Sequence, residues 1–153
     1  MRTSDLSIAR RKRSITRRKA RELALQALYA VASTGAPIEQ ALADLAETGK
    51  IPDQALQFPA ELCKKCLENQ ARFDGLIEQA AEHWALERIA RIDRILLRMA
   101  LTELFFFLDI PPKATINEAI ELARKFSTEN SAQFVNGLLD RIARQQGVIT
   151  TES

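Results

Sequence analysis

The sequence predicts an all-α fold of about six or seven helices, and three observations support this prediction. Apolar residues recur at intervals of three and four positions, no stretch alternates as a half-buried strand would, and only five Gly and five Pro stand among 153 residues. The chain is 46% hydrophobic and 27% charged, which is typical of one globular domain. Its longest apolar run, residues 95–108, is shorter than the roughly 20 residues that cross a bilayer, so we expect no membrane span.

The first helix is predicted over residues 16–33, with Thr16 as its N-cap and Gly35 just beyond its end. Its apolar residues form one continuous stripe: Ala20, Leu23, Ala24, Ala27, Leu28 and Val31. A shorter helix is predicted over residues 37–48 and ends at Gly49. A longer helical stretch follows over residues 59–80.

This third stretch carries an internal Asp74-Gly75 pair, which we expect to bend or break it because Gly weakens a helix interior. Pro52 and Pro59 bracket the connection before it. The apolar side of the stretch is formed by Leu62, Cys66, Leu67, Phe73, Leu76, Ile77 and Ala80.

The second half opens with a helix over residues 89–108 that is apolar on several sides, so we expect it at the centre of the fold. Pro111-Pro112 ends it. Thr115 and Glu118 form a predicted capping box ahead of the next helix, which ends at Phe126. The last helix is predicted from Asn130 or Ser131 to Gly147.

Charge is distributed unevenly along the chain. The first 21 residues hold nine Lys or Arg and one acid, which leaves 13 of the 22 basic and 19 of the 20 acidic side chains in the remaining 132 residues. A basic arm on an acidic body is typical of a protein that binds a polyanion, although solvated and targeting tails share this composition. Residues 1–15 are expected to be a basic extension without ordered structure, and an organellar transit peptide stays open as an alternative.

Four cations of this arm stand at the start of the first predicted helix: Arg17, Arg18, Lys19 and Arg21. A helix N-terminus carries partial positive charge, so each nearby cation costs about 0.3–1 kcal/mol, and we expect the cluster to bring no stability to the folded chain. A phosphate at the same place would interact favourably with both the side chains and the free N–H groups. We therefore interpret the cluster as a nucleic-acid contact, with a solubility or targeting tail as the alternative.

No motif for catalysis or metal binding was found. Cys63 and Cys66 have CxxC spacing, but zinc needs four ligands and His83 is the only histidine, so we expect ordinary thiols of a reducing compartment. The sequence lacks a nucleophile elbow, an HExxH and a P-loop. We expect no enzyme activity, no metal, no cofactor and no small-molecule substrate. The run Phe105-Phe106-Phe107 is expected to be core or a partner-facing patch and not a base-stacking platform.

Gly137 lies inside the last predicted helix, where Gly costs about 1 kcal/mol relative to Ala. We expect something to approach its backbone closely, either a neighbouring helix or an RNA strand or protein partner. Gln133 and Asn136 flank it with amides that can pair with base edges or face water.

Four blocks of the sequence, taken together, resemble the signature blocks of the bacterial transcription antitermination factor NusB family. They are residues 17–29 (RRKARELALQALY), 91–98 (RIDRILLR), 116–126 (INEAIELARKF) and 134–140 (FVNGLLD), and they occur in the family's order. The resemblance extends from about residue 16 to residue 143.

The resemblance implies a compact bundle of two three-helix halves, about residues 16–84 and 85–147, in one domain with a tail over residues 148–153. It implies a cytoplasmic protein without enzymatic activity that binds boxA-type single-stranded RNA of ribosomal RNA operon transcripts. The implied partners are NusE, a ribosomal protein that also acts in transcription, and RNA polymerase within an antitermination complex.

The resemblance also implies roles for individual residues. The implied RNA contacts at the basic arm are Arg17, Arg18, Lys19 and Arg21. Those on or near the same surface in the last helix are Gln133, Phe134 and Asn136, and Phe134 is expected to be mainly core. Tyr29 and Asp93 match positions towards the NusE side.

Two alternatives stay open. Some ribosomal RNA cytosine methyltransferases carry a NusB-like RNA-binding module, but these 153 residues show no S-adenosylmethionine fold, so we expect a free-standing binding protein. A non-enzymatic helical scaffold with a basic tether is the second alternative.

Overall fold

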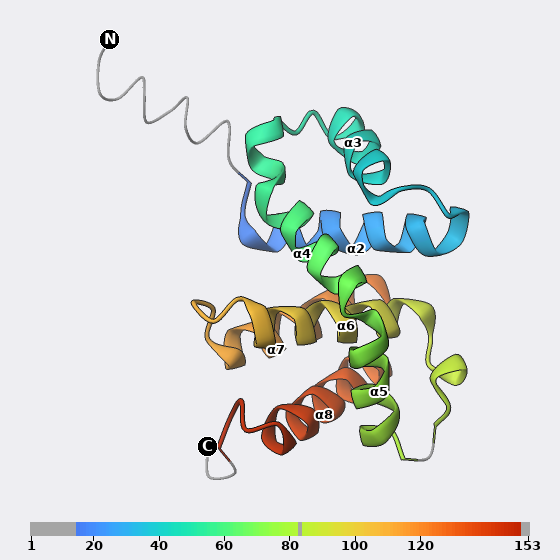
Figure 1. Cartoon of the computed structure of the whole chain (residues 1–153), viewed down its shortest axis with the longest axis vertical. Coiled ribbons are helices and arrows are strands. Elements are labelled where there is room, and N and C mark those ends of the chain that lie inside the picture. The colour runs from blue at the N-terminus through green and yellow to red at the C-terminus, as the bar shows by residue number, and fades with distance from the viewer. Residues whose placement is uncertain (1–14, 83, 151–153) are drawn as a thin grey trace. The chain divides into compact units, whose positions relative to one another are not determined.

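The computed structural model describes residues 15–82 and 84–150, and its regular elements there are all helical, as predicted (Figure 1). The predicted basic extension over residues 1–15 lies, except for Ile15, outside the described residues. No helix in the described ranges has the length and apolar character that a bilayer crossing requires. The chain divides into two compact units, residues 1–64 and 65–153, and each is described by itself.

The first unit contains α2 (Arg17–Thr34), α3 (Ile38–Thr48), the 3₁₀ turn η1 (Asp53–Leu56) and the start of α4 (Gln57–Glu68). The α2 helix matches its prediction closely. The Thr16 hydroxyl accepts the Lys19 backbone N–H at 3.0 Å, and Gly35 takes a left-handed φ of 74° while its N–H donates to the Val31 carbonyl. Its predicted apolar stripe is buried from Ala20 to Leu28, and α2 contacts α3.

The third predicted helix is in fact two, α4 and α5 (Gln70–Ala80), and the predicted break at Asp74-Gly75 is wrong. The interruption falls at Asn69, whose side-chain amide donates to the Lys65 carbonyl at 2.8 Å. The Asn69 backbone N–H also donates to this carbonyl, at 3.1 Å, so the carbonyl is shared between the amide and the backbone and the interruption is one residue long. Gly75 instead lies inside α5, because the neighbouring Asp74 is held there by Arg98.

The second unit contains α5, the 3₁₀ turn η2 (Leu86–Arg88), α6 (Arg91–Phe106), α7 (Pro112–Phe126) and α8 (Glu129–Gln145). Within this unit α6 has the central position that the sequence predicts, since it contacts α5, α7 and α8 and buries ten of its residues. Arg98 of α6 forms two hydrogen bonds to Asp74 of α5, from Nε to Oδ1 at 2.7 Å and from Nη2 to Oδ2 at 3.0 Å. This bidentate pair fixes α5 against α6.

The helix starts of α7 and α8 differ from their predictions. The predicted Thr115–Glu118 capping box is wrong, because α7 begins three residues earlier at Pro112, whose ring fixes a helical φ and whose missing N–H is not needed there. Thr115 is buried inside α7 and donates to Glu103 Oε1 at 3.4 Å. The α8 helix begins at Glu129 with Thr128 as its cap.

Candidate nucleic-acid interface

The start of α2 presents exposed cations on a capped helix end. Arg17, Arg18 and Lys19 are exposed in its first turn, and this turn has no acidic residue. The Lys19 side chain is 50% exposed, with its Nζ 3.9 Å from Glu22 Oε2. An exposed ion pair at this distance contributes little, so the Lys19 charge is available to an anion. The arrangement suits phosphate groups.

Two of the four predicted RNA contacts in this cluster, Arg17 and Arg21, also make contacts within the fold, which the expectation of a cluster without a stabilising role did not include. The Arg17 guanidinium lies over the Phe58 ring, 3.9 Å from its centroid, a cation–π contact. Arg21 is only 5% exposed, because it lies on the same helix face as the buried Ala24 and Leu25. Its burial counts against a direct phosphate contact.

The start of α8 presents polar and aromatic groups. Gln133 and Asn136 are exposed, so both amides are accessible to base edges or water. Phe134 is half-buried and not fully part of the core. The Thr128 hydroxyl accepts the Ser131 N–H at 3.0 Å and so caps this helix end. Because the α2 cations belong to the first unit and these amides to the second, a single surface formed by both sets stays a prediction.

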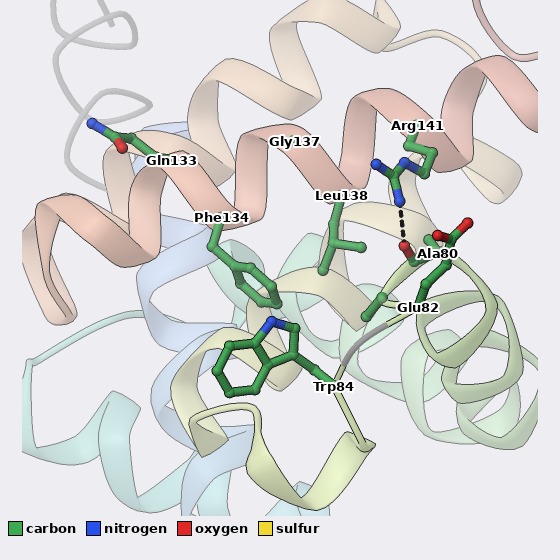
Figure 2. A pocket seen from close by; sticks show the side chains of 9 residues that line it. Ala80, Glu82, Trp84, Gln133, Phe134, Gly137, Leu138 and Arg141 are labelled. Atoms are coloured by element: carbon green, nitrogen blue, oxygen red, sulfur yellow. Dashed lines mark hydrogen bonds between the residues drawn. The ribbon is translucent and has the colours of Figure 1, made fainter.

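Gly137 of α8 borders an open cavity (Figure 2). A Cβ atom built on it would meet no atom within 4 Å apart from its immediate surroundings in the helix, so close packing of a neighbouring helix, one of the two expected causes of this glycine, is wrong. The cavity has a volume of about 260 Å³, and its lining includes Trp84, Phe134, Leu138 and Arg141. The other expected cause, an approach of an RNA strand or protein partner, stays a prediction.

Two residues at this cavity, Trp84 and Arg141, carry no role predicted from the sequence. Trp84 lies between α5 and η2 and is 54% exposed, although a large aromatic residue outside a helix normally packs into the core. The exposed Arg141 donates from Nη1 to the Ala80 carbonyl at 2.7 Å, which ties α8 to the end of α5. The one signal in the sequence was Trp84 itself, a lone tryptophan outside any apolar stripe.

Asp93, implied as a NusE-side residue, is buried in the second unit and is 5% exposed. Ser127, just after α7, and Ser131, in the first turn of α8, are its hydrogen-bonding neighbours, and the Ser127 hydroxyl donates to Ser131 Oγ at 2.8 Å, while Asp93 Oδ1 has no hydrogen-bond partner among the described residues. Burial raises the pKa of this carboxyl above its ordinary value. Asp93 therefore supports the α7–α8 turn from within and is not placed for direct partner contact. Tyr29, the other implied partner residue, is 41% exposed on α2.

The two cysteines of α4 are both buried. Burial raises the pKa of the Cys66 thiol from 9.0 to about 11, which keeps it protonated near neutral pH. Within residues 15–82 and 84–150, no three His, Cys, Asp or Glu side chains come together as a metal site would require.

Comparison with known proteins gives one consistent result. A family model described as the NusB family matches residues 18–144. The transcription antitermination protein NusB of Myxococcus xanthus (strain DK1622) is 44% identical over 83% of this chain and 94% of its own length. That of Geobacter sulfurreducens (strain ATCC 51573 / DSM 12127 / PCA) is 45% identical over 83% of this chain and 93% of its own length.

Solved structures share the fold. NusB of T. maritima superposes with a TM-score of 0.79 at 37% identity, covering 86% of this chain and 93% of that one. The structure of antitermination factors NusB and NusE in complex with dsRNA gives a TM-score of 0.77 at 24% identity, covering 84% and 96%. With the family model matching both units and curated relatives above 40% identity over most of their length, this chain belongs to the NusB family.

Proposed function

We propose that this chain is a non-enzymatic transcription antitermination factor that binds boxA-type single-stranded RNA of ribosomal RNA operon transcripts together with NusE. The observation that carries the proposal is the family match, which extends from residue 18 to residue 144 and so includes all residues of both candidate groups except Arg17. The bacterial relatives described above are themselves transcription antitermination proteins. We propose that it acts in the cytoplasm, in an antitermination complex with RNA polymerase.

The two groups would divide the binding between them. Arg18 and Lys19 are exposed cations at a helix N-terminus and would contact phosphates, which provide affinity without sequence selection. Gln133 and Asn136 would pair with base edges, which provide selection. Phe134 would add an aromatic contact beside them, and the exposed Tyr29 would face NusE. Arg17 would contribute in part, since it also contacts Phe58.

The related NusB–NusE structure contains double-stranded RNA. Our proposal specifies a single strand, because exposed amides and an aromatic side chain read unpaired bases, whereas duplex RNA is recognised mainly by shape and backbone. A duplex therefore belongs among the test ligands.

We also propose that residues 16–147 form one NusB-like domain of the kind that antitermination proteins contain. The match to nearly the whole length of antitermination proteins supports this assignment.

Direct binding measurements test the proposal. The full chain is titrated with a boxA-like strand, a scrambled strand of equal length and a duplex, each with and without NusE. We expect NusE to strengthen binding and the boxA-like strand to bind most tightly. Gln133→Ala or Asn136→Ala should reduce the preference over the scrambled strand about fivefold, a loss near 1 kcal/mol for one hydrogen bond. If all three RNAs bind equally or not at all with NusE present, the function is not boxA recognition.

A further inference from the structure

The cavity beside Gly137 has an aromatic wall that the fold itself does not require. Trp84 leaves 54% of its surface in solvent, and Phe134 is half-buried beside the same cavity (Figure 2). Burying these rings would have stabilised the chain, since aromatic side chains gain most from removal from water. Their exposure at one cavity indicates a ligand with an apolar, flat surface.

Gly137 opens the opposite wall. Its helix would be more stable with Ala there, and nothing in the surrounding structure would prevent the added methyl group. Gly75 of α5 is equally open, so an open glycine alone is no sign of a site. Gly137 differs because it lines the cavity, where a missing Cβ lets a ligand approach the helix backbone.

The polar groups at the cavity favour a nucleobase. Arg141 uses one N–H on the Ala80 carbonyl, and a guanidinium has five, so donors remain for ligand oxygens or ring nitrogens. Glu82 is exposed at the rim and accepts N–H groups, which bases carry and phosphates do not. The volume of about 260 Å³ lies below the roughly 300–1,000 Å³ of pockets for drug-sized molecules, which suits a single planar ring system.

We infer that this cavity receives one unstacked base of the bound RNA strand, with the Trp84 indole as the stacking surface, Gly137 as the opening and Arg141 as the polar contact. The inference rests on the proposed RNA-binding function and adds to it a single-base pocket. Aromatic stacking suits any base and so provides affinity, while the Arg141 and Glu82 groups distinguish one base from another.

Trp84 is the only tryptophan in the chain, so its fluorescence reports on this cavity directly. A boxA-like strand should quench the emission on binding. Replacing each nucleotide in turn by an abasic one should remove the quenching at one position and leave it intact at the others. NusE alone should not quench, because the inferred occupant is RNA.

Affinity measurements on variants test the same contact. Trp84→Ala should weaken binding of the boxA-like strand about tenfold, and Trp84→Phe should restore most of the loss, since stacking needs only an aromatic face. In the Trp84→Ala protein, an abasic nucleotide at the position that removes the quenching should cause no further loss of affinity.

Gly137→Ala and Gly75→Ala form a matched pair. Both should raise Tm by roughly 2–4 °C, because Ala favours a helix interior over Gly. Only Gly137→Ala should weaken RNA binding, by severalfold, since its methyl group would enter the cavity.

The outcomes separate the two proposals. If the unaltered chain binds none of the RNAs, the proposed function and the pocket are both overturned. Tight RNA binding without quenching, or with equal effects of every abasic position, overturns the pocket alone. Quenching by NusE without RNA shows a protein side chain in the cavity and also overturns it. An RNA affinity that Gly137→Ala leaves unchanged would contradict a base lying against Gly137.

Discussion

The first turns of α2 and α8 have the same kind of N-cap but side chains of opposite charge. At α2 and at α8 a threonine hydroxyl accepts a backbone N–H three residues on, at 3.0 Å in both cases. The α8 start carries Glu129, which complements the helix dipole and accepts from Arg124 Nε at 3.0 Å. The α2 start has no acid and several exposed cations. The α8 start thus has an acid in its own first turn that complements the helix dipole, whereas the first turn of α2 has none and would be complemented by an external anion.

The largest effect should come from removing the exposed cations at α2. The Arg18→Ala, Lys19→Ala double variant should lose at least about tenfold in affinity for single-stranded RNA, while Tm stays unchanged or rises slightly. If each side chain contacts one phosphate, the slope of log affinity against log salt should flatten by about 1.4. Lys64→Ala with Lys113→Ala changes the net charge equally at exposed positions elsewhere and is the control. An equal loss in the control would assign the effect to net charge alone.

The buried cation at α2 should behave in the opposite way. Arg21→Ala should cost about 1–3 kcal/mol of stability, because it removes a buried charged side chain and the contacts it makes. Chemical denaturation measures the loss, and RNA titration at a temperature where the variant is folded should show little change. A stable variant that has lost RNA binding would instead make Arg21 a direct contact that becomes accessible on binding.

The caps provide a finer comparison of the two helix starts. Thr16→Ala and Thr128→Ala should each lower stability by about 1 kcal/mol in the free protein. With RNA bound, the loss at Thr16 should shrink, because a phosphate can accept the Lys19 N–H that the variant leaves free. Melting curves with and without RNA measure both. Equal losses under both conditions would place the phosphates away from the α2 end.

The smallest effect concerns Asp93 at the α8 start and depends on pH. Because burial raises its pKa above 3.8, the folded state keeps this proton at pH values where the unfolded chain has lost it, so stability falls as pH rises from about 4 through the folded-state pKa. Asp93→Asn should remove that dependence and melt higher than the unaltered chain at pH 7. Asp109→Asn, at an exposed position, controls for the change in charge. A parallel pH profile in both variants would contradict the burial cost.

Helical periodicity predicted most elements because one buried stripe fixes both the type and the length of a helix. It failed where a side chain overrides local preference. The interruption falls at Asn69, whose amide shares the Lys65 carbonyl with the backbone, while Gly75 lies inside a helix next to Asp74, which Arg98 of another helix holds. Such a partner lies 24 positions away in sequence and leaves no local signal.

Residue type and charge predicted part of the candidate site. The burial of individual polar side chains could not be predicted from them. The basic cluster and the two amides could be identified from residue types. The burial of Arg21 and Asp93 could not, because polar side chains are expected at the surface until packing shows otherwise. Trp84 was missed for the converse reason, since an aromatic residue is expected inside.

The buried thiols of α4 allow the free energy of local opening to be measured without introducing a labelling site. Cys66 is 2% exposed with a pKa near 11, so an alkylating reagent at pH 8 meets neither an accessible sulfur nor a thiolate in the closed protein. Labelling must then wait for the segment around α4 to open. When reclosing is faster than the reagent, the labelling rate gives the free energy of that opening, and any ligand that rigidifies the segment will slow the reaction.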